Sequence, residues 1–223
     1  LWMGLCDPPD HTRRRKPWHQ SFTPKALAEM RPKVQAIVDG LLDRVADRGE
    51  MEFIDDFAFP LPTSVIGLTM NLPPEDTEKV KVWSDLIGHY MGGATTDDDN
   101  MERAQEGVIS MADYFREVVA QRRSQPQDDM IGLMLRAEAE GSLTEDEVVA
   151  NCVLLVFAGH ETTTHLLGNG LYHLLRDREQ YELLANDGEL AKNAVEEFLR
   201  FDGAVPAVPR VATSSNPSAT SSR

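Results

Sequence analysis

The stretch from Ala150 to Leu175, ANCVLLVFAGHETTTHLLGNGLYHLL, decides the fold of this 223-residue chain. No proline occurs between residues 144 and 176, so the backbone can run through this stretch as one helix. Thr144 and Glu147 have the spacing of a capping box, which places the start of the helix at about residue 144. The sequence therefore predicts a mainly α-helical protein built around a long central helix over residues 144–176.

The middle of this helix has an unusual chemistry for a buried element. Val153–Phe157 is apolar on every side, which predicts a helix that is buried all round. Gly159, Thr162 and Thr163 then follow at i, i+3 and i+4 and share a face, and Glu161 stands next to them. Breaks of this kind in an apolar pattern tend to mark function or strain. The structural alternative for the threonines is a hydroxyl bonded back to the preceding turn.

Composition and charge exclude some classes of function. The chain has 37 acidic and 22 basic residues and a net charge of −15, which disfavours nucleic-acid binding because phosphates attract positive surfaces. Its two cysteines, Cys6 and Cys152, lie far apart, as is typical of free thiols in a reducing compartment. No apolar run approaches the roughly 18 residues that a bilayer requires. We therefore expect a cytoplasmic protein whose partners include neither nucleic acid nor membrane.

Several segments together resemble the cytochrome P-450 family of haem-thiolate monooxygenases, bacterial soluble type. Ala158–Thr163, AGHETT, resembles the oxygen-binding motif Ala/Gly-Gly-x-Asp/Glu-Thr-Thr of that family's long central helix. Asp7–Arg15 resembles the segment Asp-Pro-Pro-x-His-Thr-Arg-x-Arg. Glu197–Arg200 matches a buried Glu-x-x-Arg ion pair, and Arg210 matches an arginine of the strand that follows. These ordered motifs extend over nearly the whole chain.

The resemblance implies a haem cofactor and assigns residues to it. His11 and Arg15 would hold one haem propionate, and Arg210 would be a second propionate partner. Ala158 and Gly159 would leave room for dioxygen against the helix backbone. Thr162 would hold dioxygen or a water by a hydrogen bond, and Glu161 would deliver protons through a water chain. Glu197 and Arg200 would form a structural ion pair.

The resemblance also implies a reaction and its partners. One oxygen atom from O2 would be inserted into a small apolar organic substrate, with electrons from NAD(P)H passing through a reductase and an acidic ferredoxin-type donor. Arg13, Arg14 and Lys16 would contribute to a basic face on which that donor docks.

The family's iron ligand has no match in this sequence. The family places it in Phe-x-x-Gly-x-x-x-Cys-x-Gly, and neither Cys6 nor Cys152 stands in such a segment. We therefore expect residues 1–210 to be a partial P-450 domain that lacks an N-terminal part and the haem-cysteine region, without a metal ligand or turnover of its own. Residues 211–223 are polar and of low complexity, which indicates a disordered or frame-shifted tail.

The remaining sequence predicts further helices and a minor β component. Met51–Ile54 reads as a short strand, and the family resemblance implies a second strand at Pro206, Pro209 and Arg210. In the resembling family, two helices and their loop form a lid over the substrate. Periodicity and breakers place the other helices at 24–47, 63–71, 78–90, 101–123, from about 128, 177–185 and 189–201, and the lid pair corresponds to 78–90 and 101–123.

Two other functions remain open from the residues alone. His160, Glu161 and His165 look like the His-Glu-x-x-His motif of zinc hydrolases with one residue too many. That spacing puts the histidines about 140° apart around a helix, whereas zinc ligands need to share a face. The second alternative is a non-catalytic, all-helical interaction protein, which explains the amphipathic helices but not the polar centre of the buried one.

Overall fold

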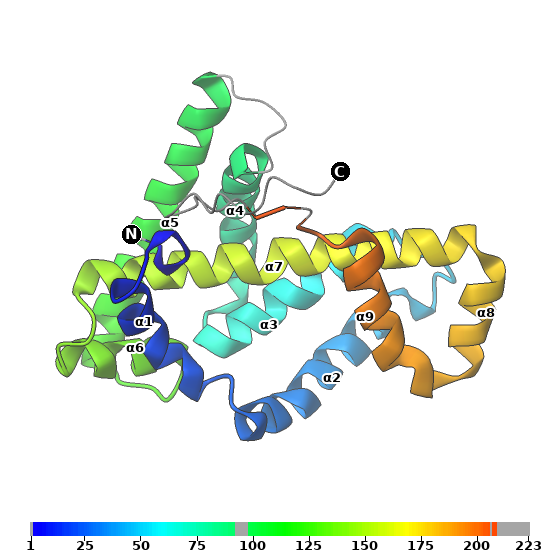
Figure 1. Ribbon diagram of the computed structural model, residues 1–223, viewed down its shortest axis with the longest axis horizontal. Helices are drawn as coiled ribbons and strands as arrows, with labels where there is room; N and C mark the ends of the chain where they lie inside the picture. Colours follow the sequence, from blue (N-terminus) through cyan, green and yellow to red (C-terminus); the bar gives the residue numbers. More distant parts are fainter. Residues whose placement is uncertain (1, 92–97, 206, 209–223) are drawn as a thin grey trace, which may run out of the picture. The chain divides into compact units, whose positions relative to one another are not determined.

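In the computed structural model, residues 2–91, 98–205, 207 and 208 are described, and they contain helices and loops but no strand (Figure 1). The chain divides into two compact units, Leu1–Gly168 and Asn169–Arg223. None of the described helices combines the length and the apolar character that a membrane crossing requires. The α-helices are α1 (Asp10–Arg15), α2 (Pro24–Ala46), α3 (Pro60–Met70), α4 (Thr77–Met91), α5 (Asp98–Ser124), α6 (Met130–Ala139), α7 (Glu145–Arg176), α8 (Arg178–Asn186) and α9 (Ala191–Asp202).

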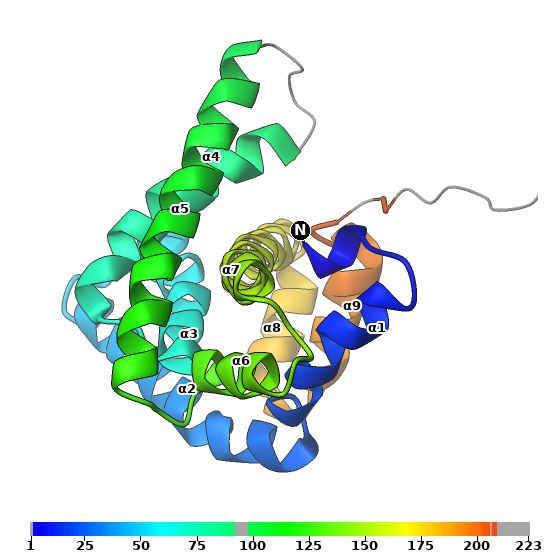
Figure 2. The same cartoon turned by 90° about the vertical axis from the view of Figure 1, so that its left-hand side faces the viewer.

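The predicted long central helix is confirmed as α7. Its first turn is closed by the predicted capping box: the Glu147 backbone N–H donates to Thr144 Oγ1 at 3.3 Å, and the Thr144 N–H donates to Glu147 Oε2 at 3.0 Å. Figure 2, a view along this helix, shows α1, α3, α5 and α6 arranged around its part in unit 1. A helix enclosed in this way needs apolar residues on most of its sides, as the sequence indicated.

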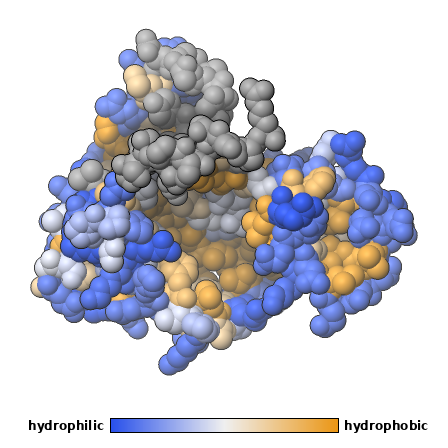
Figure 3. All heavy atoms as spheres, viewed as in Figure 1, coloured by the Kyte–Doolittle hydropathy of each residue, from blue (hydrophilic) through white to orange (hydrophobic). Residues whose placement is uncertain are grey.

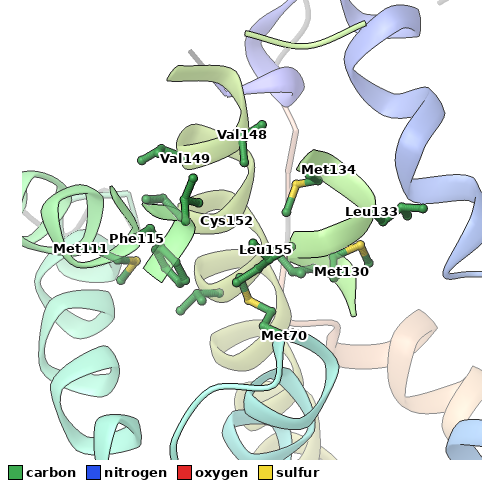
Figure 4. Close-up of a cluster of buried hydrophobic side chains, with 14 of the residues drawn as sticks. Met70, Met111, Phe115, Met130, Leu133, Met134, Val148, Val149, Cys152 and Leu155 are labelled. Atoms are coloured by element: carbon green, nitrogen blue, oxygen red, sulfur yellow. The ribbon is translucent and has the colours of Figure 1, made fainter. Parts of the chain in front are cut away.

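The core of unit 1 is formed by side chains from α3, α4, α5, α6 and α7 together with Trp18, and Figure 4 shows part of it. Met70 of α3, Phe115 of α5, Met134 of α6 and Cys152 of α7 have no solvent exposure. Burial raises the pKa of the Cys152 thiol far above its ordinary value, because a thiolate loses its hydration in an apolar core. Cys152 is therefore an inert core residue.

A buried ion pair connects three of these helices. Arg122, at the end of α5, lies 3.1 Å from Asp129, and both side chains are almost fully buried. Asp129 also caps α6 by accepting from the Gly132 N–H at 2.8 Å. The Arg122 guanidinium donates to the last carbonyls of α3, those of Met70 and Asn71, at 3.3 Å. A cation at this place complements the negative end of the α3 dipole.

The strand predicted at Met51–Ile54 was wrong. Ile54–Ala58 forms a π-helical turn instead. The turn lets Phe53 stack on Phe57, with ring centroids 5.6 Å apart, and lets Asp56 accept from the Glu52 backbone N–H at 2.9 Å. Both interactions join residues four apart, which an extended strand would separate. Of the second predicted strand, around Pro206 to Arg210, only residues 207 and 208 are described, and they are not in a strand; Pro206, Pro209 and Arg210 lie outside the described residues.

The helices expected around the lid are present as α4 and α5. They pack against each other within unit 1. Residues 92–97 between them lie outside the described residues, so the lid itself stays a prediction.

A buried carboxylate fixes α1 against the start of α7. Glu147 accepts hydrogen bonds from Arg13 Nη1 at 2.7 Å and Nη2 at 2.8 Å, and Arg14 Nε lies 2.9 Å from Glu147 Oε1. The Glu147 side chain is 8 % exposed. Its hydrogen bonds from Arg13 lower the pKa of the Glu147 carboxyl to about 2, because donors and cations stabilise the ionised form.

This lowered pKa predicts that unit 1 loses stability in acid. A carboxyl with a lowered pKa in the folded state stabilises that state above its unfolded pKa, and the contribution disappears as the pH falls to the folded pKa. For Glu147 the window runs from about pH 4.5 down to about pH 2, and the shift corresponds to roughly 3 kcal/mol. Urea unfolding followed across this window should show the loss.

Glu147→Gln should be less stable than the parent at neutral pH and should lose much less stability across the same window. Glu29→Gln is the matched control, since Glu29 forms an exposed pair with Lys25 at 4.0 Å and should leave the pH dependence unchanged. An acid-induced loss that is equal in the parent and in Glu147→Gln would contradict the assignment.

Candidate active site on the central helix

The turn Ala158–Thr163 lies in the middle of α7, and the threonine hydroxyls on it bond to the helix backbone. Thr162 Oγ1 donates to the Ala158 carbonyl at 2.9 Å, and Thr163 Oγ1 donates to the Gly159 carbonyl at 3.2 Å. A threonine hydroxyl bonded to the preceding turn of its own helix is the structural alternative that the sequence left open. Each oxygen keeps lone pairs and can accept a further bond, but donation to another group would need a rotation of the side chain. The role of Thr162 towards dioxygen stays a prediction.

Ala158 and Thr162 share one stripe of α7, which begins at Glu147. Residues 147, 151, 154, 158 and 162 are separated by three or four positions and therefore lie along one side of a helix. At its start this stripe is covered by α1 through Glu147. Farther along, Ala158 is exposed and Thr162 is half-buried. Trp2 stacks on Phe157 with ring centroids 5.5 Å apart, so the N-terminal segment borders the open part. Figure 3 shows apolar residues where α7 and α3 reach this face of unit 1.

Gly159 faces a different neighbour. A Cβ atom on Gly159 would overlap Cδ1 of Ile66 on α3 and lie 3.0 Å from its Cγ1. The end of the Ile66 side chain therefore occupies the space that a larger residue at position 159 would need, and the role of Gly159 towards dioxygen stays a prediction. This contact joins residues far apart in sequence, and no local pattern indicated it.

His160 and Glu161 face α4. His160 is 2 % exposed, and its Nδ1 lies 3.2 Å from the Val156 carbonyl and 3.3 Å from Ser84 Oγ. Burial lowers the pKa of His160, which keeps the imidazole neutral. The Glu161 carboxylate lies against the backbone of α4 at Gly88. Ser84 and Gly88 border the candidate site, and the sequence alone gave no sign of either.

The histidines of the zinc alternative have different surroundings. His160 is enclosed between Phe59, 5.4 Å away by ring centroids, and α4, whereas His165 is exposed. Within the described ranges, no group of at least three His, Cys, Asp or Glu side chains is arranged for a metal ion.

The basic residues of α1 divide into two groups. His11 is half-buried and Arg15 is exposed, and no hydrogen bond or ion pair joins their side chains to another described residue. Arg13 and Arg14 instead bind Glu147. Because Arg14 is 6 % exposed, the prediction that it belongs to a docking face was wrong.

The Glu197–Arg200 pair forms within unit 2, on α9. Arg200 Nε donates to Glu197 Oε2 at 2.8 Å, and Nη2 donates to Oε1 at 2.6 Å. The hydrogen bonds from Arg200 lower the pKa of Glu197. The expected burial is wrong for this structure, because the two side chains are 56 % and 69 % exposed. Arg210 lies outside the described residues.

Comparison with known proteins defines the class. The family profile described as Cytochrome P450 matches residues 94–216. Cytochrome P450 CYP107DY1 of Priestia megaterium is 38 % identical over 204 residues, which are 91 % of this chain and 49 % of that protein. Steroid C26-monooxygenase of Mycobacterium tuberculosis is 35 % identical over 208 residues, 93 % of this chain and 56 % of that protein. The crystal structure of myxobacterial CYP267B1 in complex with myristic acid matches with a TM-score of 0.83 and 42 % identity, over 90 % of this chain and 49 % of that one.

This chain belongs to the cytochrome P450 family. It spans about half the length of the relatives that it matches. The fold agrees with this assignment, because the described residues superpose on half of a P450 enzyme and share its helical architecture.

The packing of Gly159 can be tested by adding the missing methyl group. Gly159→Ala should lower the free energy of unfolding by roughly 1–3 kcal/mol, because the added carbon overpacks the contact with Ile66. Combining it with Ile66→Val, which removes the overlapping Cδ1, should recover most of the loss. Urea unfolding of the two single variants and the double variant measures this coupling.

The matched control is Gly40→Ala on α2, because a Cβ atom there would meet nothing within 4 Å. This change should stabilise the chain by up to about 1 kcal/mol through helix propensity alone. A Gly159→Ala variant as stable as Gly40→Ala would rule out the close contact.

Proposed function

We propose that this chain provides the oxygen-side and propionate-side residues of a haem-dependent monooxygenase. The observation that carries the proposal is the stripe on α7 that α1 covers at Glu147 and leaves open at Ala158 and Thr162. Glu161 stands beside that open part. A small residue, a hydroxyl and a carboxylate placed together on a rigid helix suit the binding of a small oxidant and the delivery of protons to it.

The described residues fit a haem on two sides. His11 and Arg15 lie four residues apart on α1, and neither is engaged by another described side chain. Such donors suit a carboxylate, because arginine forms forked, charge-assisted bonds and histidine adds a donor. The propionates would therefore be held by His11 and Arg15, with Arg210 as a further partner, and the open stripe at Ala158 and Thr162 would face the haem. When bound, a haem with a thiolate ligand would supply the activation of O2 and favour cleavage of the O–O bond.

The chain's own residues would manage protons and water. In the resting arrangement the Thr162 hydroxyl proton is held by the Ala158 carbonyl. Rotation of Thr162 would release that proton for a hydrogen bond towards the open stripe. Glu161 would hold the next proton on its carboxylate and pass it to Thr162 or to a water beside it. Because a proton leaves Glu161 in each cycle, the carboxylate needs access to water.

Neither cysteine of this chain suits the role of the thiolate that would bind the haem iron. Cys152 is fully buried in the core. Cys6 Sγ lies 2.9 Å from Arg14 Nη1 and donates to the Trp2 carbonyl at 3.4 Å. We infer that the thiolate comes from residues outside this sequence and that the 223 residues alone do not turn over.

The substrate and the partners follow from the same proposal. We expect a small apolar organic substrate, in keeping with the steroid and the fatty acid in the names of two related proteins. Electrons would pass from NAD(P)H through a reductase and an acidic ferredoxin-type donor. Of the residues expected on its docking face, Lys16 is exposed directly after α1 and would contribute to the docking. The free cysteines Cys6 and Cys152 suit a cytoplasmic location.

The proton-delivery roles of Glu161 and Thr162 predict that changing either residue in the complete haem-loaded enzyme separates electron consumption from product formation. Glu161→Gln should lower the rate of product formation by about 100-fold or more, the range expected for loss of a general acid. Thr162→Ala should divert electrons to peroxide while electron uptake continues. Product, peroxide and NAD(P)H consumption are measured together.

Thr163→Ala is the matched control, because Thr163 makes the same backbone bond as Thr162 from an exposed position. It should leave the ratio of product to NAD(P)H unchanged. Full coupling in Thr162→Ala and Glu161→Gln would remove both residues from the mechanism.

A further inference from the structure

The Glu161 carboxylate is seated against a glycine of the neighbouring helix. A Cβ atom on Gly88 of α4 would overlap both carboxylate oxygens of Glu161 and lie 2.6 Å from its Cδ. The same side chain therefore could not keep its place beside any other residue at position 88. Gly88 is buried, and Glu161 is half-buried.

The backbone conformation of α4 does not require glycine at position 88. Gly88 lies inside a helix, and its φ is not in the left-handed region that favours glycine. Glycine in a helix interior costs roughly 0.5–1 kcal/mol relative to alanine. The space taken by the Glu161 carboxylate is the feature that explains it.

Gly107 of α5 provides a contrast. A Cβ atom there would lie 2.8 Å from the Trp83 carbonyl oxygen and 3.0 Å from Leu86 Cβ. Those atoms belong to the backbone and the first side-chain carbon of α4, so a clash would push the two helices apart. At Gly88 the obstructing atoms form the far end of a flexible side chain. Alanine at position 88 would therefore move the carboxylate and leave the helices in place.

The Glu161 side chain also lines a groove of about 430 Å³ between α4, α7 and the turn Ile54–Ala58. Its titratable lining consists of Asp55 of the turn, Lys81 and Asp85 of α4, and His160, Glu161 and His165 of α7. This groove provides the access to water that a proton-carrying carboxylate needs. A carboxylate that left its seat would exchange the α4 backbone for other neighbours in this groove or on the open stripe.

We infer that Gly88 is a positioning residue for Glu161. Because glycine has no side chain, it leaves on α4 the space that the Glu161 carboxylate occupies, between the groove and the turn that bears Thr162. The inference rests on the proposed role of Glu161 as a proton carrier. It adds that the register of α4 along α7 determines where the proton is held.

The seat can be tested in the 223-residue chain by carbon NMR with glutamate labelled at Cδ. The Glu161 signal is the one that disappears in Glu161→Gln. Gly88→Ala should shift this signal and alter its pH titration curve, because the carboxylate moves to new neighbours. Gly40→Ala should leave both unchanged, because a Cβ atom there would meet nothing within 4 Å. An unchanged signal in Gly88→Ala, or an equal shift in Gly40→Ala, would overturn the inference.

A second measurement needs no change at Gly88. In the parent chain the Gly88 amide signal should follow the titration of Glu161, since the carboxylate touches this residue, and the response should vanish in Glu161→Gln. If the Gly88 amide signal does not change while Glu161 titrates, the contact between the Glu161 carboxylate and Gly88 is ruled out. This holds even if Gly88→Ala fails to fold.

The ratio of product formed to NAD(P)H consumed in the complete enzyme separates this inference from the proposed function. Gly88→Ala should raise the peroxide share of the electrons while the haem spectrum stays unchanged. If Glu161→Gln still converts all consumed NAD(P)H into product, the proposed function fails, whatever the NMR result. If Glu161→Gln uncouples and Gly88→Ala does not, the proton role stands and the positioning role of Gly88 is wrong.

Discussion

The ion pair between Glu147 and Arg13 fixes the orientation on which the site depends. Glu147 lies at the start of α7, closes the capping box with Thr144, and holds α1 through a forked pair of hydrogen bonds. Because Ala158 and Thr162 lie on the same stripe as Glu147, turning this carboxylate towards α1 also determines which way they face. One buried carboxylate thus sets the start of α7, its rotation about its axis and the place of α1 with His11 and Arg15.

The sequence allowed prediction of features with a local cause. The long helix followed from its periodicity and capping box, and the α2 start at Thr23 and Pro24 from helix-entry chemistry. Features that depend on distant contacts were missed or mistaken. The partner of Arg13 lies 134 residues away, so a basic run looked like an exposed face. The contacts of Gly159 with Ile66 and of Gly88 with Glu161 need the packed helices before they can be seen.

The polar turn of α7 is accommodated by its neighbours in different ways. Thr162 and Thr163 bond to their own helix, so their hydroxyl groups are satisfied without a ligand. His160 is enclosed and neutral between Ser84 and Phe59. The Glu161 carboxylate lies against Gly88 of α4. The turn is therefore covered by α3 at Gly159 and by α4 at His160 and Glu161, and it is exposed at Ala158 and Thr163.

The most direct test of this account is vibrational spectroscopy of carbon monoxide bound to the reduced, complete enzyme. The C–O stretching frequency responds to the polar groups around the ligand. Thr162→Val removes the hydroxyl group on the open stripe, and Thr163→Val removes the one beside it that faces elsewhere. The account predicts a shifted frequency in Thr162→Val and an unchanged one in Thr163→Val. No shift in either variant, or a shift only in Thr163→Val, would contradict the claim that the stripe of α7 through Ala158 and Thr162 faces the haem.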